Sequence, residues 1–370
     1  MICILLCYLG ALDASSKTVG DGEWSYFSAA CWEFGTHLFD SSLDSKVPLG
    51  LVSNNWGGTG IQAWSPPEVM RKCKRFEVVS DIKMYPNVDK IKVFMERNTA
   101  GDVDPNVPST LYYAMITPYK SMKIKGVLWF QGEGNVADGT YACMQDKMVT
   151  AWRNLLGQDF SFIYTQLSTW DNGGLGVLPQ FRMQQATILD ITNNAAMITA
   201  ADLGDPESPY HEIHSRKKVE VGRRLALASS SLIYGAGSSI PHMGPLVRNV
   251  TSFEHPVFGY SARVTFDEES CGDSGLHLSE PQECPSYSAA KDGGCGFIQL
   301  EYSASSITRK TQAVLATVAV TAPNVVEFVP NEAMFSSKAL NVLYCLGDYP
   351  LMTIYNSIDI PLLPTKIAIP

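Results

Sequence analysis

The feature that most constrains the fold is an alternation of strand-length apolar runs with segments of helical spacing, from about residue 24 to about residue 230. The strand-like runs are Val47–Ser53, Gly126–Gln131, Phe162–Leu167 and Ala195–Ala200. The helix-like segments are Trp24–Leu43, Tyr141–Leu156, Pro179–Ile191 and one from about Ser215 to Ala228. Because strands that alternate with helices form parallel sheets with both faces covered, this region predicts an α/β fold.

The pattern changes after about residue 235, where short strand-like runs follow one another without a strong helix. These runs are Val257–Phe266, Phe297–Tyr302, Gln312–Val320, Asn324–Val329 and Ala339–Leu346. Such a series predicts a β-rich region. We therefore divide the chain into an α/β domain over residues 1–235 and a β-rich accessory domain over residues 236–370, with residues 66–112 as an insertion over the sheet.

Charge and hydropathy exclude two classes of partner. The formal net charge is −9, whereas a nucleic-acid-binding chain needs a basic face. No apolar run approaches the roughly 18 residues of a membrane-spanning helix, so we expect a soluble chain without a membrane span. The apolar segment Met1–Leu12 has two readings. It is either the core of a signal peptide, although no Lys or Arg precedes it, or a buried parallel strand.

The cysteines indicate an oxidising compartment. Three of the nine, Cys271, Cys284 and Cys295, lie in a stretch rich in Gly, Ser and Pro, which suits a disulfide-stapled loop. Asn249–Thr251 is a glycosylation sequon. We therefore expect a secreted or lysosomal protein. No CxxC or paired Cys/His spacing supports a metal site.

Three loops that follow predicted strands carry unusual residues, and ligands of open α/β sheets bind at this edge. Gly57 and Gly58 follow the first of these strands, and their backbone N–H groups suit an oxyanion site, although a Gly-Gly pair taken alone more often marks a plain tight turn. After the next strand, Gln131 is a candidate oxyanion donor and Glu133 a candidate orienting group, or both belong to a solvated loop. His214 stands at a helix start with acids upstream, as a general base or as a structural histidine.

The three loops together, in this order, resemble the SGNH-type esterases and most closely the sialate O-acetylesterases. The segments that carry the resemblance are Gly50–Trp64, Lys125–Asn135, Ala151–Arg153, Gln166–Leu167, Asp202–His214 and Val221–Ala226. The resemblance covers nearly the whole chain from about Trp24. It implies an SGNH-hydrolase-like parallel sheet and hydrolysis of O-acetyl esters, typically on sialic acids, without a metal or organic cofactor.

The resemblance also assigns roles to single residues. It makes His214 the general base and places Gly57 or Gly58, with Gln131, in the oxyanion hole, where Glu133 and Asn135 contribute to substrate binding. Many SGNH esterases have an aspartate three residues before the histidine, but His211 stands there in this chain. The carboxylate must then come from Asp205, which we rank first, or from Asp202 or Glu212.

The larger departure is the nucleophile. In this family a serine lies at the end of the first strand, in a Gly-Gln-Ser-Asn-Met type motif upstream of the Trp-Gly-Gly loop, and nothing here matches it. Gly272–Gly275 contains a serine but follows His214 and lies in the β-rich region. Ser53 belongs to the Gly57 loop. We therefore expect that the first strand and nucleophile are absent from this sequence, which would leave open sheet edges and lower stability.

Three functions fit these observations. The first is a longer esterase that removes O-acetyl groups from sialic acid or a related sugar by a Ser–His–acid mechanism. The second is a catalytically inactive glycan-binding protein, in which Trp56, Trp64 and Trp129 offer apolar faces to a sugar. The third is an esterase that acts on plant-type acetylated polysaccharide. In each case the partner is an acetylated sugar or glycan.

Overall fold

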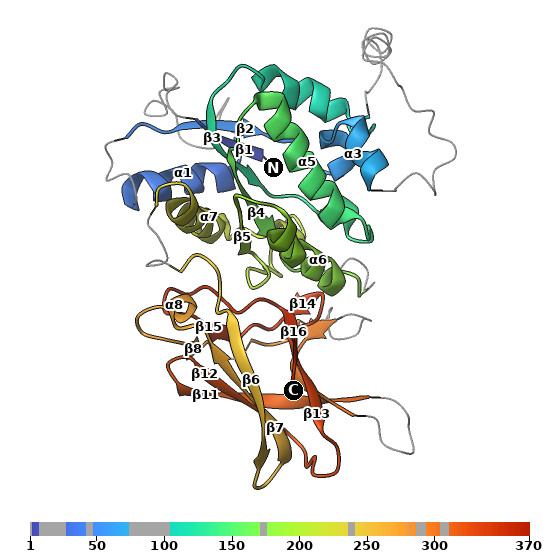
Figure 1. The fold of residues 1–370 in the computed structure, drawn as a ribbon, viewed down its shortest axis with the longest axis vertical. Helices are drawn as coiled ribbons and strands as arrows, with labels where there is room; N and C mark the ends of the chain where they lie inside the picture. Colours follow the sequence, from blue (N-terminus) through green and yellow to red (C-terminus); the bar gives the residue numbers. More distant parts are fainter. Residues whose placement is uncertain are drawn as a thin grey trace.

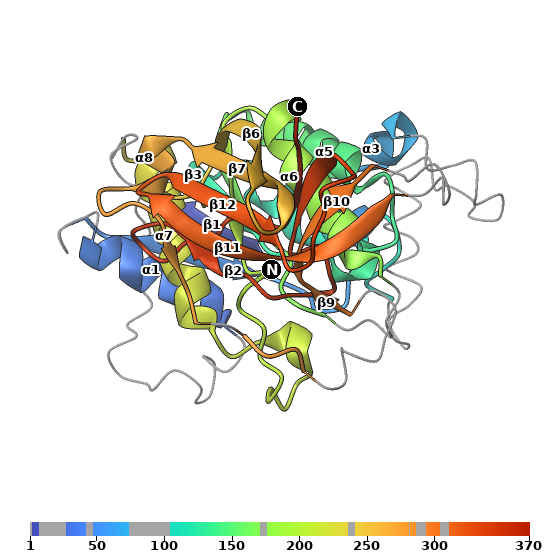
Figure 2. The ribbon, with the colours of Figure 1, turned by 90° about the horizontal axis from the view of Figure 1, so that it is seen from below.

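The computed structural model describes residues 2–6, 27–41, 47–73, 104–170, 176–235, 241–280, 282–285, 294–303 and 311–370. An α/β part and a β-rich part lie end to end along the long axis (Figure 1). In the view along that axis, the antiparallel strands of the β-rich part lie in front of the α/β part (Figure 2). The predicted class, an α/β fold followed by a β-rich region, is confirmed.

The α/β part is built on a five-stranded sheet of order β2-β1-β3-β4-β5. The strands are β1 Ile2–Leu6, β2 Gly50–Asn54, β3 Ile124–Trp129, β4 Ser161–Gln166 and β5 Ala195–Thr199. β3, β4 and β5 are parallel to one another. The four strand-like runs of the sequence are therefore β2 to β5, each displaced by only a few residues.

The N-terminal strand corrects two expectations. β1 pairs with β2 on one side and with β3 on the other, and both pairings are antiparallel. The predicted parallel orientation of this segment is therefore wrong. The sheet edges expected to be left open beside a missing first strand are not found between β2 and β3, because β1 hydrogen-bonds to both. The expected loss of stability stays a prediction.

Helices cover both faces of this sheet because its strands bury side chains on both sides (Figure 1). Phe162 and Tyr164 pack on one face, with α5 and α6, while Ile163 packs on the other, with α1 and α7. The longer helices are α1 Ala29–Ser41, α5 Tyr141–Leu156, α6 Leu178–Ile191 and α7 Lys218–Leu232. The shorter ones are α2 Ile61–Trp64, α3 Pro67–Lys72, the π-helix Tyr112–Ile116, and the 3₁₀ turns Thr117–Tyr119, Glu133–Asn135 and Glu212–His214.

Helix α5 shows how the sequence pattern sets the packing. Tyr141, Met144, Met148 and Trp152 recur at helical spacing, and all four are buried. Gly157 ends the helix in the left-handed conformation, with φ of 60°. The bounds agree with those predicted from the periodicity.

Helices α1 and α7 pack at very short range on the other face. A Cβ atom on Gly222 of α7 would lie 2.6 Å from the carbonyl carbon of Glu33 in α1. Only glycine fits there, so the absent side chain brings the start of α7 against α1. This contact positions the loop that precedes α7.

The β-rich part contains a seven-stranded antiparallel sheet of order β16-β13-β10-β11-β12-β7-β6. Its strands are β6 Val247–His255, β7 Gly259–Phe266, β10 Ile298–Tyr302, β11 Gln312–Ala322, β12 Val325–Pro330, β13 Ala339–Tyr344 and β16 Thr365–Ala368. Smaller elements are α8 Glu268–Cys271, the pair β14 Tyr349–Pro350 with β9 Cys295–Gly296, and the pair β15 Ile354–Tyr355 with β8 His277–Leu278. All five predicted runs are strands, whereas β6, β16 and the two-residue strands β8, β9, β14 and β15 were missed.

A buried arginine joins the two parts. Arg182 of α6 is fully buried and donates to the carbonyl oxygens of Leu167, Ser168, Gly347 and Asp348, at 2.6 to 3.1 Å. Burial lowers the pKa of its guanidinium to about 9, and the nearby Asp348 opposes this shift. Carbonyl oxygens from both parts therefore surround one guanidinium.

Two disulfides lie in the described residues. Cys284 pairs with Cys295, as expected for a stapled loop, but Cys271 is a buried free thiol and takes no part. The sequence did not predict the other disulfide, between Cys73 and Cys143, which ties the residues after α3 to α5.

Candidate active site

The topology brings the predicted loops to one edge of the sheet. Strands β2 and β3 both run opposite to β1, so they share a direction, and β4 and β5 share it too. The residues that follow β2, β3 and β5 therefore all leave the same edge, as the sequence predicted for a ligand site.

Two amides connect the loops after β2 and β3. Asn135 Oδ1 accepts the backbone N–H of Ile61 at 2.9 Å and the Gln131 side chain at 2.9 Å. Gln131 Nε2 also donates to the Thr59 carbonyl at 3.1 Å. Both donors of the buried Gln131 amide are thus engaged inside the protein. This geometry gives Gln131 and Asn135 a part in holding the Trp-Gly-Gly-Thr loop, while the predicted oxyanion role of Gln131 stays a prediction.

The glycines of that loop are open to solvent. Gly57 and Gly58 are exposed, and Gly58 has a φ of 73°, which favours glycine. A Cβ at either position would meet nothing within 4 Å. Their backbone N–H groups are therefore accessible to a ligand. Glu133 is half-buried in the 3₁₀ turn after β3.

The geometry of His214 suits a general base. Its Nδ1 lies 2.8 Å from the carbonyl oxygen of Tyr210, so Nδ1–H donates and Nε2 carries the lone pair. The 3₁₀ turn that ends at His214 follows His211, whose φ is 69°. Nε2 of this exposed ring has no hydrogen-bond partner among the residues that the structure describes.

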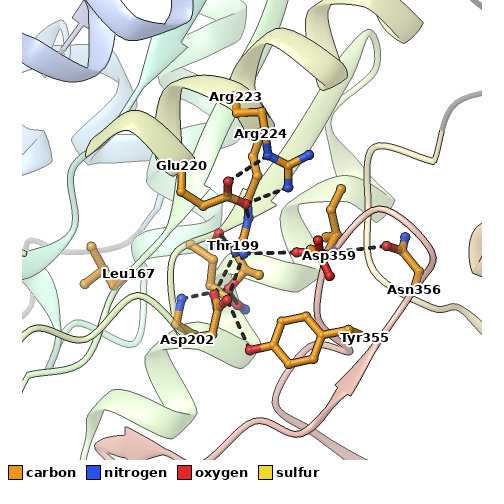
Figure 3. A network of polar contacts seen from close by, with 12 residues as sticks. Leu167, Thr199, Asp202, Glu220, Arg223, Arg224, Tyr355, Asn356 and Asp359 are labelled. Carbon is orange, nitrogen blue, oxygen red and sulfur yellow. Dashed lines mark hydrogen bonds and ion pairs between the residues drawn. The ribbon is translucent and has the colours of Figure 1, made fainter. Parts of the chain in front are cut away.

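Two of the three candidate acids, Asp205 and Asp202, bind arginines. Asp205 accepts Nε of Arg216 at 2.6 Å, Nη2 at 2.8 Å and the Arg216 backbone N–H at 3.0 Å. These bonds hold the pKa of Asp205 well below its usual range. Asp202 accepts both terminal nitrogens of Arg224, at 2.7 and 2.8 Å, and Tyr355 reaches it at 3.3 Å (Figure 3). Glu212 lies half-buried in the same turn as His214.

A pocket of about 830 Å³ opens beside His214. Its lining comes from α1, the loop before His214 and the start of α7: Ala29, Glu33, Pro209, Tyr210, His211, His214, Ser215, Arg216, Lys218 and Val219. Of the predicted site residues only His214 lines it. Sequence reasoning missed Tyr210 and Lys218. Their positions, four residues before and four residues after His214, are the signal that could have identified them.

The serines and tryptophans named from the sequence have other surroundings. Ser53 Oγ accepts the backbone N–H of Ser28 at 3.1 Å and the Asn55 amide at 2.7 Å. Ser274 is exposed in the turn after α8. Trp64 and Trp129 are each 1% exposed, so the expectation that they face a sugar is wrong, because they pack edge-on in the core. Trp56 is 52% exposed and remains a candidate.

No metal cluster and no membrane span occur in the described ranges. No group of three or more His, Cys, Asp or Glu side chains there is arranged to hold a metal ion. None of the helices described has the length and apolar character that crossing a membrane requires.

Comparisons with known proteins place these features in a family. Residues 27–231 match the family described as carbohydrate esterase, sialic acid-specific acetylesterase. Sialate O-acetylesterase of Rattus norvegicus is 31% identical over 265 residues, and that of Homo sapiens is 32% identical over 262 residues. These alignments cover 64% and 65% of this chain, and 48% and 46% of the relatives. The chain thus spans about half the length of these relatives.

A solved structure is similar to the whole fold. A carbohydrate acetylesterase from Xanthomonas citri superposes with a TM-score of 0.67 over 93% of this chain and 66% of its own chain, at 22% identity. At this identity the likeness concerns the fold, including the order of an α/β part followed by a β-rich part.

Proposed function

Because this chain belongs to the sialic acid-specific acetylesterase family of carbohydrate esterases, we propose that it serves the hydrolysis of O-acetyl esters on sialic acid or a related sugar. The observation that supports this most directly is the geometry of His214. Its ring is held by the Tyr210 carbonyl through Nδ1, and Nε2 is left without a partner beside the pocket. A neutral imidazole in this tautomer accepts a proton from an attacking hydroxyl.

The carbonyl of Tyr210 takes the place that we first gave to a carboxylate. Asp205 and Asp202 were the expected partners of His214, but they bind Arg216 and Arg224. In this proposal Asp205 positions His214 indirectly. Its ion pair with Arg216, two residues after His214, fixes the backbone of this segment. A carbonyl oxygen is a hydrogen-bond acceptor that holds the ring and its tautomer without a full charge.

The mechanism also requires oxyanion donors and a nucleophile. The exposed N–H groups of Gly57 and Gly58 are the candidate oxyanion donors, held in place by Gln131 and Asn135. The nucleophile in this mechanism is a serine, and within the described ranges no hydroxyl is bonded to His214 Nε2. The serine hydroxyl would attack the acetyl carbonyl while His214 takes its proton, and His214 would give that proton to the departing sugar oxygen, leaving an acetyl-serine. Water, deprotonated by His214, would then attack the acetyl-serine, releasing acetate and restoring the serine hydroxyl. The two disulfides support a secreted or lysosomal compartment.

The test is acetate release from O-acetylated N-acetylneuraminic acid by the full-length protein. Replacing His214 by Ala should lower kcat by about a hundredfold to ten-thousandfold, as expected for loss of a general base. His255→Ala, in the β-rich part, is the matched control and should leave kcat unchanged. Equal turnover by wild type and His214→Ala would refute the assignment.

The second candidate is a glycan-binding protein without hydrolysis. It is favoured by the absence, within the described ranges, of any hydroxyl bonded to His214 Nε2. Sugar binding with no acetate release by the full polypeptide would establish it, and hydrolysis that requires His214 would exclude it.

A further inference from the structure

A half-buried lysine, Lys218, lines the same pocket as the proposed base. Lys218 is the first residue of α7, four residues after His214, and both side chains line the same pocket. Its ammonium lies 5.5 Å from the centroid of the Phe130 ring, a cation–π contact. The lysine is therefore held against the pocket wall and does not extend freely into solvent.

The charged groups around Lys218 leave its ammonium able to bind an anionic ligand. In the described part of the chain no carboxylate forms an ion pair with its Nζ. Burial lowers the pKa of Lys218, and Glu133 and Asp205 oppose this shift from a distance. Asp205 is itself neutralised by Arg216, so Glu133, and Glu33 on α1, are the remaining acids nearby. A partly desolvated cation without a bonded counter-ion gains from an anionic ligand.

The remaining lining indicates what carries that anion. Tyr210 and Val219 are 68% and 56% exposed and offer an aromatic and an aliphatic face. A volume of about 830 Å³ suits a small-molecule ligand such as a sugar of one or two rings. The first two residues of α7 line the pocket, and the N-terminal end of a helix carries a partial positive charge. Because the chain as a whole carries −9, an acidic ligand needs such a local positive site to bind here.

We propose that Lys218 binds the carboxylate of an acidic sugar and thereby selects acidic over neutral acetylated sugars at the His214 pocket. This rests on the proposed function, because the pocket must be the place where the sugar ester lies. Lys218 is a specificity residue in this proposal and takes no part in proton transfer.

The experiment compares two probes that differ only in charge, N-acetylneuraminic acid and its carboxamide. Calorimetry with the full polypeptide should show the acid binding about tenfold or more tightly than the amide, as expected for a charged hydrogen bond. Lys218→Met keeps the stem against Phe130 and should make the two affinities equal. Lys217→Met, the exposed neighbour outside the pocket, should keep the preference.

A second measurement uses the wild-type protein, in case Lys218→Met does not fold. After ¹³C-methylation of the lysines, which preserves their charge, the Lys218 resonance should move on addition of the acid and stay in place with the amide. Absence of this shift, equal affinities in wild type, or a preference that survives Lys218→Met would each overturn the proposal.

The two proposals fail separately. Acetate released equally fast from acidic and neutral acetylated sugars would overturn the role of Lys218 and leave the esterase function in place. A Lys218-dependent preference for the acid in a polypeptide that releases no acetate would support the acidic ligand and remove the hydrolysis.

Discussion

Replacing Asp202 by Asn should destabilise the protein without removing the proposed base. The Asp202 carboxylate and the Arg224 guanidinium have side chains that are 4% and 2% exposed and form two bonds of 2.7 and 2.8 Å. Figure 3 shows Arg224 among Asp202, Glu220 and the loop that carries Tyr355 and Asp359. Removing one partner of a buried pair leaves an uncompensated charge and typically costs about 3 to 5 kcal/mol.

The structure places the cost at the lower end of that range. Arg224 keeps a second carboxylate, because its Nε donates to Glu220 at 2.7 Å, and an asparagine still accepts one hydrogen bond. We therefore expect Asp202→Asn to lower the free energy of unfolding by about 3 kcal/mol. Arg224→Met in the same chain should recover part of this loss, so the two substitutions should not be additive.

Urea denaturation followed by tryptophan fluorescence measures this loss, with acetate release measured where the variant is still folded. Glu327→Gln is the control, because its pair with the half-exposed Arg263 should contribute less than about 1 kcal/mol. A loss below about 1 kcal/mol for Asp202→Asn, or a stable variant with no turnover, would refute the reasoning. The latter would make Asp202 the acid of the mechanism.

Two further predictions concern the Asp205 ion pair and the first disulfide. The pKa of Asp205 is depressed in the folded state, so its stabilising effect is complete above the ordinary aspartate value of about 3.9 and lost as the pH falls through the folded value. Thermal midpoints of wild type and Asp205→Asn should differ at neutral pH and converge on acidification, and a constant difference would contradict this. Replacing Cys73 and Cys143 by Ser should cost roughly 4 kcal/mol in urea denaturation, because the bond closes a loop of 70 residues. An unchanged urea midpoint would be inconsistent with that role.

Much of the fold could be predicted because local patterns and packing agree. Helix α5 has an unbroken apolar stripe and a glycine end signal, so both of its bounds followed from the sequence. The direction of β1 could not be predicted, since an apolar run pairs equally well either way along a strand. β6 was missed because most of its side chains are exposed and its pattern carries little apolar periodicity.

The position of the site could be predicted from the sequence, but the hydrogen-bond and ion-pair partners of its residues could not. Strand ends predicted which loops share an edge, and His214 was found from its helix start. Which carboxylate meets which cation depends on side-chain reach across the fold, and the arginines of α7 and the Arg216 loop outcompete His214 for Asp202 and Asp205. A main-chain acceptor such as the Tyr210 carbonyl leaves no trace in residue identity.

The buried arginines limit how the molecule can move. Arg182 is held by carbonyl oxygens before α6 and at Gly347, and Arg224 reaches both Asp202 and the Asp359 carbonyl. A hinge opening between the α/β and β-rich parts would strip acceptors from two buried cations at once. We therefore expect the α/β and β-rich parts to move together. Under the proposed function, a sugar would therefore enter and leave through the open side of the pocket, beside the exposed Tyr210.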